Sequence, residues 1–201
     1  YGGHAVGRQW DPALLVGDFR RSHCQICLMT SADGLAWTRH LDQDGLSRVF
    51  RGPGEARDPC LLRAGKLWHL YYAGYEWKGG EELPGVYVRT SEDLIHWSES
   101  RLAHRWRHSD FGLHNWDTEC PHVVCRGGYY YLFRTENYAL ARTHVFRSAD
   151  PMDFGVDRLG EYLGVLPVAA PEIIVDGEVE YITSNHNLAG GTMLCRLVWE
   201  Q

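Results

Sequence analysis

The sequence predicts an all-β fold and, within that class, a β-propeller built from repeated small sheets. Two observations carry this prediction: two short motifs recur along the chain, and no stretch shows the apolar period of a long helix. A chain of 201 residues with 44% hydrophobic residues can bury a core, so we expect one domain over residues 1–201. Radial repetition of four-stranded sheets is the architecture that fits such repeats.

The first repeated motif is a serine, an aspartate two residues later and an aromatic residue at the end. Aspartate accepts hydrogen bonds from nearby backbone N–H groups, so each copy is predicted to form a turn after a strand. We expect the aromatic residue to be buried and to begin the next strand. The copies, about 60 residues apart, are residues 31–37 (SADGLAW), 91–97 (SEDLIHW) and 148–154 (SADPMDF).

The second repeated motif is a proline followed by an apolar run, and it predicts where each blade starts. Proline at the first residue of a strand costs no ladder hydrogen bond, and the apolar run suits an inner strand close to the propeller axis. Four copies predict blade starts near residues 11, 58, 119 and 170, although the first repeat is shorter than the others by about one strand. The copies are residues 10–15 (WDPALL), 57–62 (RDPCLL), 119–124 (ECPHVV) and 170–175 (APEIIV).

Charge and composition exclude several functions. The net charge of −6 gives no basic surface for nucleic acid, and the one basic cluster, residues 101–108, is interrupted by apolar residues. No run of about 18 apolar residues occurs, so no membrane span is expected. Among the six cysteines, Cys24 and Cys27 form a CxxC motif without a second pair at zinc-binding spacing. Free thiols in a reducing cytoplasm are favoured, with secretion as the alternative.

Acidic residues at the predicted blade starts indicate a reaction that uses carboxylates. Inner strands of a propeller begin around one mouth of the central channel, so Asp11, Asp58, Glu119 and Glu172 are expected to gather there. Paired carboxylates are the equipment of glycoside hydrolysis, in which one is a general acid and another a nucleophile or base. This chemistry needs no cofactor, although an acid-rich mouth is also compatible with calcium.

Two of the motifs resemble those of the five-bladed propeller enzymes of glycoside hydrolase families 32, 43 and 68. Residues 57–59 (RDP) and residues 119–120 (EC) look like two motifs of that superfamily, and residues 25–34 look like its second-blade strand and turn. The resemblance implies that Glu119 is the acid/base and that Asp58 stabilises the transition state, with Arg57 supporting them. It also implies furanoside substrates such as fructosides or arabinosides.

The first blade departs from the pattern of these families. Their nucleophile or base is an aspartate near the start of that blade, in a motif such as WMNDPNG, which this sequence lacks. Asp11 is one candidate for this role, but it lies closer to Asp58 than the family pattern places it. The other interpretation, which we favour, is that an N-terminal blade is missing.

Further candidates surround the predicted acid. Arg134 and Glu136, on the strand after Glu119, are expected either to hold the protonation state of Glu119 or to form a cross-strand ion pair. Glu172 is expected to face the mouth. A sugar subsite is predicted from His114, Trp116 and Asp117.

The leading hypothesis is a glycoside hydrolase that acts on a carbohydrate. The alternative is a non-catalytic carbohydrate-binding or assembly propeller that has lost its nucleophile or base. A propeller without one blade would expose inner edges, so we also expect that copies of the chain can associate.

Overall fold

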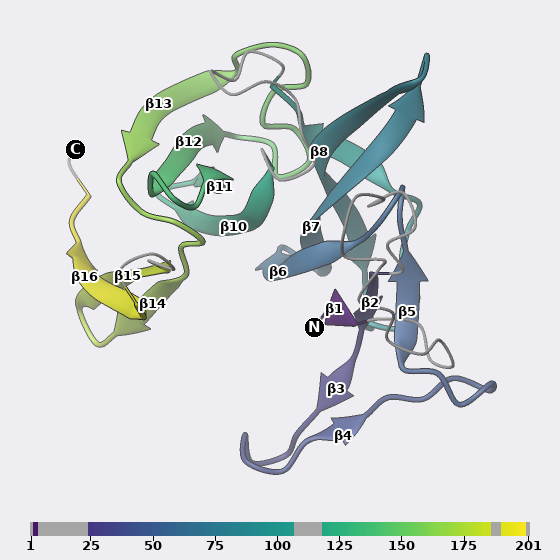
Figure 1. The fold of residues 1–201 in the computed structure, drawn as a ribbon. Coiled ribbons are helices and arrows are strands. Elements are labelled where there is room, and N and C mark those ends of the chain that lie inside the picture. The colour runs from purple at the N-terminus through teal and green to yellow at the C-terminus, as the bar shows by residue number, and fades with distance from the viewer. Residues whose placement is uncertain (1, 4–23, 107–117, 186–189, 200–201) are drawn as a thin grey trace.

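The computed structural model describes residues 2–3, 24–106, 118–185 and 190–199, and all regular elements in this part of the chain are β-strands (Figure 1). The strands form several small antiparallel sheets arranged side by side around a central region. This arrangement confirms the predicted all-β fold. None of the described residues forms a helix long and apolar enough to cross a membrane.

Two sheets have four strands each, and in both the strands follow one another in chain order. The first comprises β6 (Arg57–Ala64), β7 (Leu67–Lys78), β8 (Glu81–Ser91) and β9 (Arg101–His104). The second comprises β10 (Glu119–Arg126), β11 (Tyr129–Asn137), β12 (Arg142–Ser148) and β13 (Glu161–Leu166). The first strands of the two sheets, β6 and β10, lie next to each other near the centre (Figure 1).

Smaller sheets flank these two. A three-stranded sheet near the C-terminus comprises β14 (Ile173–Asp176), β15 (Val179–Asn185) and β16 (Thr192–Leu197). On the other side, β1 (Gly2–Gly3), β2 (Gln25–Cys27) and β5 (Arg48–Arg51) form a sheet. A separate hairpin projects from it (Figure 1) and comprises β3 (Met29–Thr30) and β4 (Thr38–Arg39).

The same backbone distortion occurs at three successive strand starts. Asp58, Cys120 and Ala170 have left-handed backbones with φ of 56°, 47° and 48°, and each precedes a proline. A residue before proline normally adopts an extended conformation, so these three positions are unusual. In β6 and β10 the distortion coincides with a shift of the pairing register, which is a β-bulge.

The bulge defines which residues of the repeats are equivalent. Arg57 and Glu119 each stand one residue before the left-handed position, and they pair with Ala73 of β7 and Thr135 of β11 respectively. Ala169 holds the same place in the third repeat. Glu172 follows its proline and is therefore not the counterpart of Glu119.

The serine-aspartate motifs form the predicted turns. Oδ1 of Asp33 accepts hydrogen bonds from the backbone N–H groups two and three residues later, at 2.8 and 2.9 Å. Asp93 makes the same two bonds at 2.9 and 2.8 Å, and Oδ1 of Asp150 accepts the first of them at 2.8 Å. The motif is thus a self-bonded turn in all three copies.

The burial of the aromatic residue differs among the three turns. Phe154 is only 1% exposed and meets Tyr71 of the preceding sheet edge-on, with ring centroids 6.1 Å apart. Trp97 is half-buried and contacts Phe50 of β5 at 5.7 Å. Trp37, in the projecting hairpin, is 57% exposed, so the expectation that all three aromatic residues are buried is wrong for this copy.

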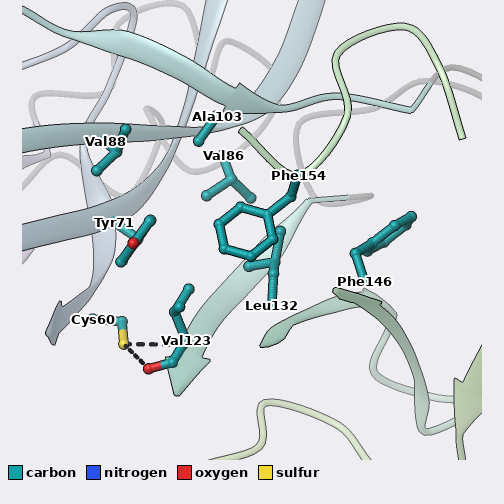
Figure 2. Close-up of a cluster of buried hydrophobic side chains, with 9 residues drawn as sticks. All are labelled: Cys60, Tyr71, Val86, Val88, Ala103, Val123, Leu132, Phe146 and Phe154. Carbon is teal, nitrogen blue, oxygen red and sulfur yellow. Dashed lines mark hydrogen bonds between the residues drawn. The ribbon is translucent and has the colours of Figure 1, made fainter. Parts of the chain in front are cut away.

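The largest apolar cluster joins the two four-stranded sheets (Figure 2). It contains side chains from both sheets together with Phe154, which enters from the loop between β12 and β13. Its buried members are Cys60, Tyr71, Val86, Val88, Ala103, Val123, Leu132, Phe146 and Phe154. The cluster fixes how β6 and β10 sit beside each other, and therefore positions the site described below.

We predict that Gly54→Ala destabilises the protein more than Gly65→Ala. Both glycines have φ of 60°, so alanine costs each about 1–2 kcal/mol of backbone strain. A Cβ on Gly54 would also lie 2.4 Å from the carbonyl oxygen of Tyr75, whereas a Cβ on Gly65 would meet nothing within 4 Å. This overlap adds about 1–3 kcal/mol to the cost at Gly54. Urea unfolding of both variants measures the difference, and equal losses would contradict the prediction.

Candidate active site

The centre of the site is a contact between the guanidinium of Arg57 and the carboxyl group of Glu119, the first residues of β6 and β10. Arg57 donates from Nε to Oε2 of Glu119 at 3.2 Å, and its Nη2 contacts Oε1 of the same carboxyl group. Such bidentate pairs fix the orientation of both groups. Because the bulge places the two residues at equivalent positions of adjacent sheets, this contact joins the strand starts across the sheet boundary.

Asp58 completes the group. Its Oδ2 lies 3.6 Å from Nε of Arg57 and accepts a hydrogen bond from the backbone N–H of Cys120 at 3.1 Å. The ligand atoms of Asp58, Glu119 and Cys120 lie within 4.8 Å of one another. The structure therefore brings together Arg57, Asp58 and Glu119, three of the residues that the sequence predicts for the site.

The protonation of Glu119 is set by its surroundings. Burial raises the pKa of Glu119 to about 8, the guanidinium of Arg57 opposes this rise, and the carboxylate of Asp58 adds to it. Pairing with Glu119 and Asp58 raises the pKa of Arg57 in spite of its burial, so Arg57 stays charged. Near neutral pH the site therefore holds a protonated glutamic acid next to a fixed positive charge.

Cys120 and Tyr138 border the carboxylates. Their Sγ and hydroxyl oxygen are 2.8 Å apart, and burial raises the pKa of Cys120 to about 12, so the thiol stays protonated. A thiol is not a ligand that calcium selects, and the guanidinium of Arg57 already lies against both carboxyl groups. The group formed by Asp58, Glu119 and Cys120 therefore does not fit a calcium ion.

Glu55 is a site residue that the sequence analysis missed. It is 3% exposed and forms an ion pair with Nη1 of Arg57, on the side of the guanidinium that does not contact Glu119. Residues two apart in an extended segment lie on the same face, so its position two residues before Arg57 was an available signal.

The other predicted residues lie elsewhere or outside the described part of the chain. Glu172, 69% exposed at its side chain, contacts Nδ1 of His122 at 2.9 Å. Arg134 is 2% exposed on β11, and Oε2 of Glu136 lies 2.9 Å from Nε of Arg142 across the β11–β12 pair. The cross-strand pair expected for this strand is thus present at Glu136. The predicted residues outside the described ranges are Asp11, His114, Trp116 and Asp117.

Known structures show the class of fold to which this site belongs. The chain has the β-propeller fold of glycoside hydrolases of families 43 and 32. No family model and no curated protein matches the sequence.

Three of the similar structures illustrate this likeness. A thermostable family 43 glycoside hydrolase has a TM-score of 0.65 and 17% identity, over 89% of this chain and 65% of its own. A family 32 β-fructofuranosidase variant of Bombyx mori in complex with sucrose has a TM-score of 0.58 and 17% identity, over 80% and 36%. An exo-β-1,3-galactanase of Clostridium thermocellum has a TM-score of 0.51 and 21% identity, over 78% and 36%. The chain thus spans between 36% and 65% of the length of these enzymes.

Proposed function

We propose that the chain carries the acid/base half of a glycoside hydrolase site, with Glu119 as the general acid and Asp58 as the stabiliser of the transition state. The observation that supports this proposal most directly is that two carboxyl groups lie within 4.8 Å of each other at the starts of adjacent strands, and burial of one of them raises its pKa to about 8. A carboxyl group that is protonated at neutral pH is what a glycosidic oxygen needs as a proton donor.

In the proposed reaction, Glu119 donates its proton to the glycosidic oxygen as the bond to the anomeric carbon breaks. Positive charge then develops on the sugar ring, and Asp58, held by the N–H of Cys120, accepts hydrogen bonds from sugar hydroxyls that strengthen in this state. Arg57 keeps the two acidic groups in place. In a retaining reaction, the nucleophile bonds to the anomeric carbon as the leaving group departs, and Glu119 then takes a proton from the water that displaces this nucleophile.

The spacing of the two carboxyl groups favours these roles over an acid and nucleophile pair. Acid and nucleophile lie about 5–5.5 Å apart in retaining enzymes, and acid and base about 6.5–9.5 Å apart in inverting ones. Asp58 and Glu119 approach more closely than either separation and share one arginine. The group that attacks the anomeric carbon is therefore expected from another part of the molecule, and Asp11 remains the predicted candidate.

The substrate class that we propose is a furanoside, as the resemblance to fructosidases and arabinanases implies. The purified chain is tested with sucrose and with nitrophenyl arabinofuranosides, and a nitrophenyl galactoside is included because one similar structure is a galactanase. Hydrolysis of a furanoside supports the proposal. Sugar binding that depends on Asp58 without any hydrolysis would instead support a non-catalytic carbohydrate-binding propeller.

The pH dependence provides a prediction for the acid. Because Glu119 must be protonated to act, kcat/KM is expected to be high below its pKa and to fall tenfold per pH unit above about pH 8. Initial rates from pH 5 to 10 measure this limb. Glu161→Gln removes a carboxylate that pairs with Arg147 at an exposed site, so this control should have the same pH profile as wild type. A profile that stays level from pH 7 to 10 would contradict the assignment of Glu119.

A further inference from the structure

One buried arginine in the site is shared by three acidic side chains. Arg57 contacts Glu119 with Nε and Nη2, lies 3.6 Å from Asp58 through Nε, and contacts Glu55 with Nη1. In the proposed function, Glu119 and Asp58 meet the substrate. Glu55 does not contact the substrate in the proposed function, yet it is the most deeply buried of the three acidic residues, at 3% exposed.

The backbone around Glu55 is held on both sides. The N–H of Tyr75 donates to the carbonyl oxygen of Pro53 at 3.3 Å, and the N–H of Ala56 donates to the carbonyl oxygen of Cys24 at 3.3 Å. Gly54 lies so close to Tyr75 that no side chain fits there. The loop between β5 and β6 therefore presents the carboxylate of Glu55 from a fixed position.

We propose that Glu55 is a positioning residue that binds the guanidinium of Arg57 on the side away from Glu119 and neutralises part of its charge, so that Arg57 holds Glu119 without forcing it to ionise. This inference rests on the proposed function and extends it. Glu119 must lose and regain a proton in each turnover, and its attraction for Arg57 changes each time. Because Glu55 lies on the other side of the guanidinium, it offsets part of the charge of Arg57, which would otherwise favour the ionised form of Glu119.

The charge of Glu55 also acts on Glu119. Removing it leaves the positive charge of Arg57 less neutralised, which favours the ionised form of Glu119. This effect lowers the pKa of Glu119. The other titratable groups that influence this pair are Asp58, Cys120, Tyr138 and Cys24, and the substitutions below leave them unchanged.

The test is a direct titration of Glu119 in the full chain. The protein is labelled with ¹³Cδ-glutamate, and the Glu119 resonance is assigned by its absence in Glu119→Gln. Glu55→Gln is expected to lower the midpoint of this titration by about one pH unit, a shift at the lower end of the range for a neighbouring charge. Glu55→Asp keeps the negative charge but moves it away from Arg57 by the length of one methylene group, so a smaller shift of the midpoint in the same direction is expected. Glu161→Gln, at the exposed pair with Arg147, is expected to leave the midpoint unchanged.

Each outcome decides the inference. An unchanged midpoint in Glu55→Gln overturns it, even if that variant is less stable, because a purely structural role would not move the titration. If Glu55→Gln does not fold, an unchanged midpoint in Glu55→Asp overturns it instead. The titration does not depend on turnover, so a chain that hydrolyses no glycoside can still show the shift. Hydrolysis with an unshifted midpoint would reject the role of Glu55 and leave the proposed function standing.

Discussion

Glu119→Gln is expected to lower kcat for sucrose or an alkyl furanoside by about 10²–10⁴-fold, the usual contribution of a general acid. Glutamine keeps the size of the side chain, and its amide oxygen can still accept one of the two hydrogen bonds from Arg57, so the fold should remain. It cannot donate a proton of suitable acidity to the leaving oxygen. The loss should be much smaller for a dinitrophenyl glycoside, because that leaving group needs little protonation.

The measurement is a comparison of kcat for the two leaving groups in wild type, Glu119→Gln and Glu161→Gln. The last variant removes a carboxylate of the same type from an exposed ion pair and should behave like wild type. An equal loss for both leaving groups would indicate that the substitution damages the site in general. Undiminished activity on sucrose or the alkyl furanoside would mean that Glu119 is not the acid.

Phe154→Ala is expected to reduce the free energy of unfolding by about 3–5 kcal/mol. The ring is 1% exposed within the cluster that joins the β6–β9 and β10–β13 sheets, and its removal leaves a cavity against Tyr71 (Figure 2). Trp37 provides a control from the chain itself, because it ends the same type of turn but is 57% exposed. Trp37→Ala should cost less than about 1 kcal/mol.

Urea unfolding followed by circular dichroism measures both variants. If the two substitutions cost the same, the packing between the two sheets does not depend on Phe154. Phe154→Ala should also reduce any hydrolytic activity, since β6 and β10 carry the two acidic groups and this cluster sets their relative position.

The strand starts could be predicted from the sequence because their signals are local. A proline and an apolar run mark the beginnings of β6 and β10, and the self-bonded turns follow from serine and aspartate two residues apart. In the repeat near residue 170, Glu172 is not equivalent to Glu119, because the motif was aligned on the charged residue rather than on the proline. Aligned on Pro171, the counterpart of Glu119 is Ala169, and Glu172 lies beyond the bulge.

The ion pair could not be predicted in the same way. Arg57 and Glu119 are far apart in the chain, and their contact depends on the packing of two sheets and on a left-handed residue before each proline. Residues before proline are expected to be extended, so sequence rules predict the opposite geometry at Asp58 and Cys120. The exposure of Trp37 could not be predicted from the sequence either, because it depends on which surface lies beside the hairpin.

The left-handed residue before each proline also bears on where a propeller can carry a reactive group. The N–H of Cys120 bonds to Asp58 of the preceding sheet at 3.1 Å, and the N–H of Ala170 bonds to Oγ1 of Thr135 of the sheet before it at 2.8 Å. In both repeats the backbone of this residue ties adjacent sheets together, while its side chain differs. The residue itself is aspartate, cysteine or alanine in the three repeats, so this backbone conformation does not require one particular side chain. The same backbone position can therefore carry a reactive group in one repeat and an inert one in another within a single propeller.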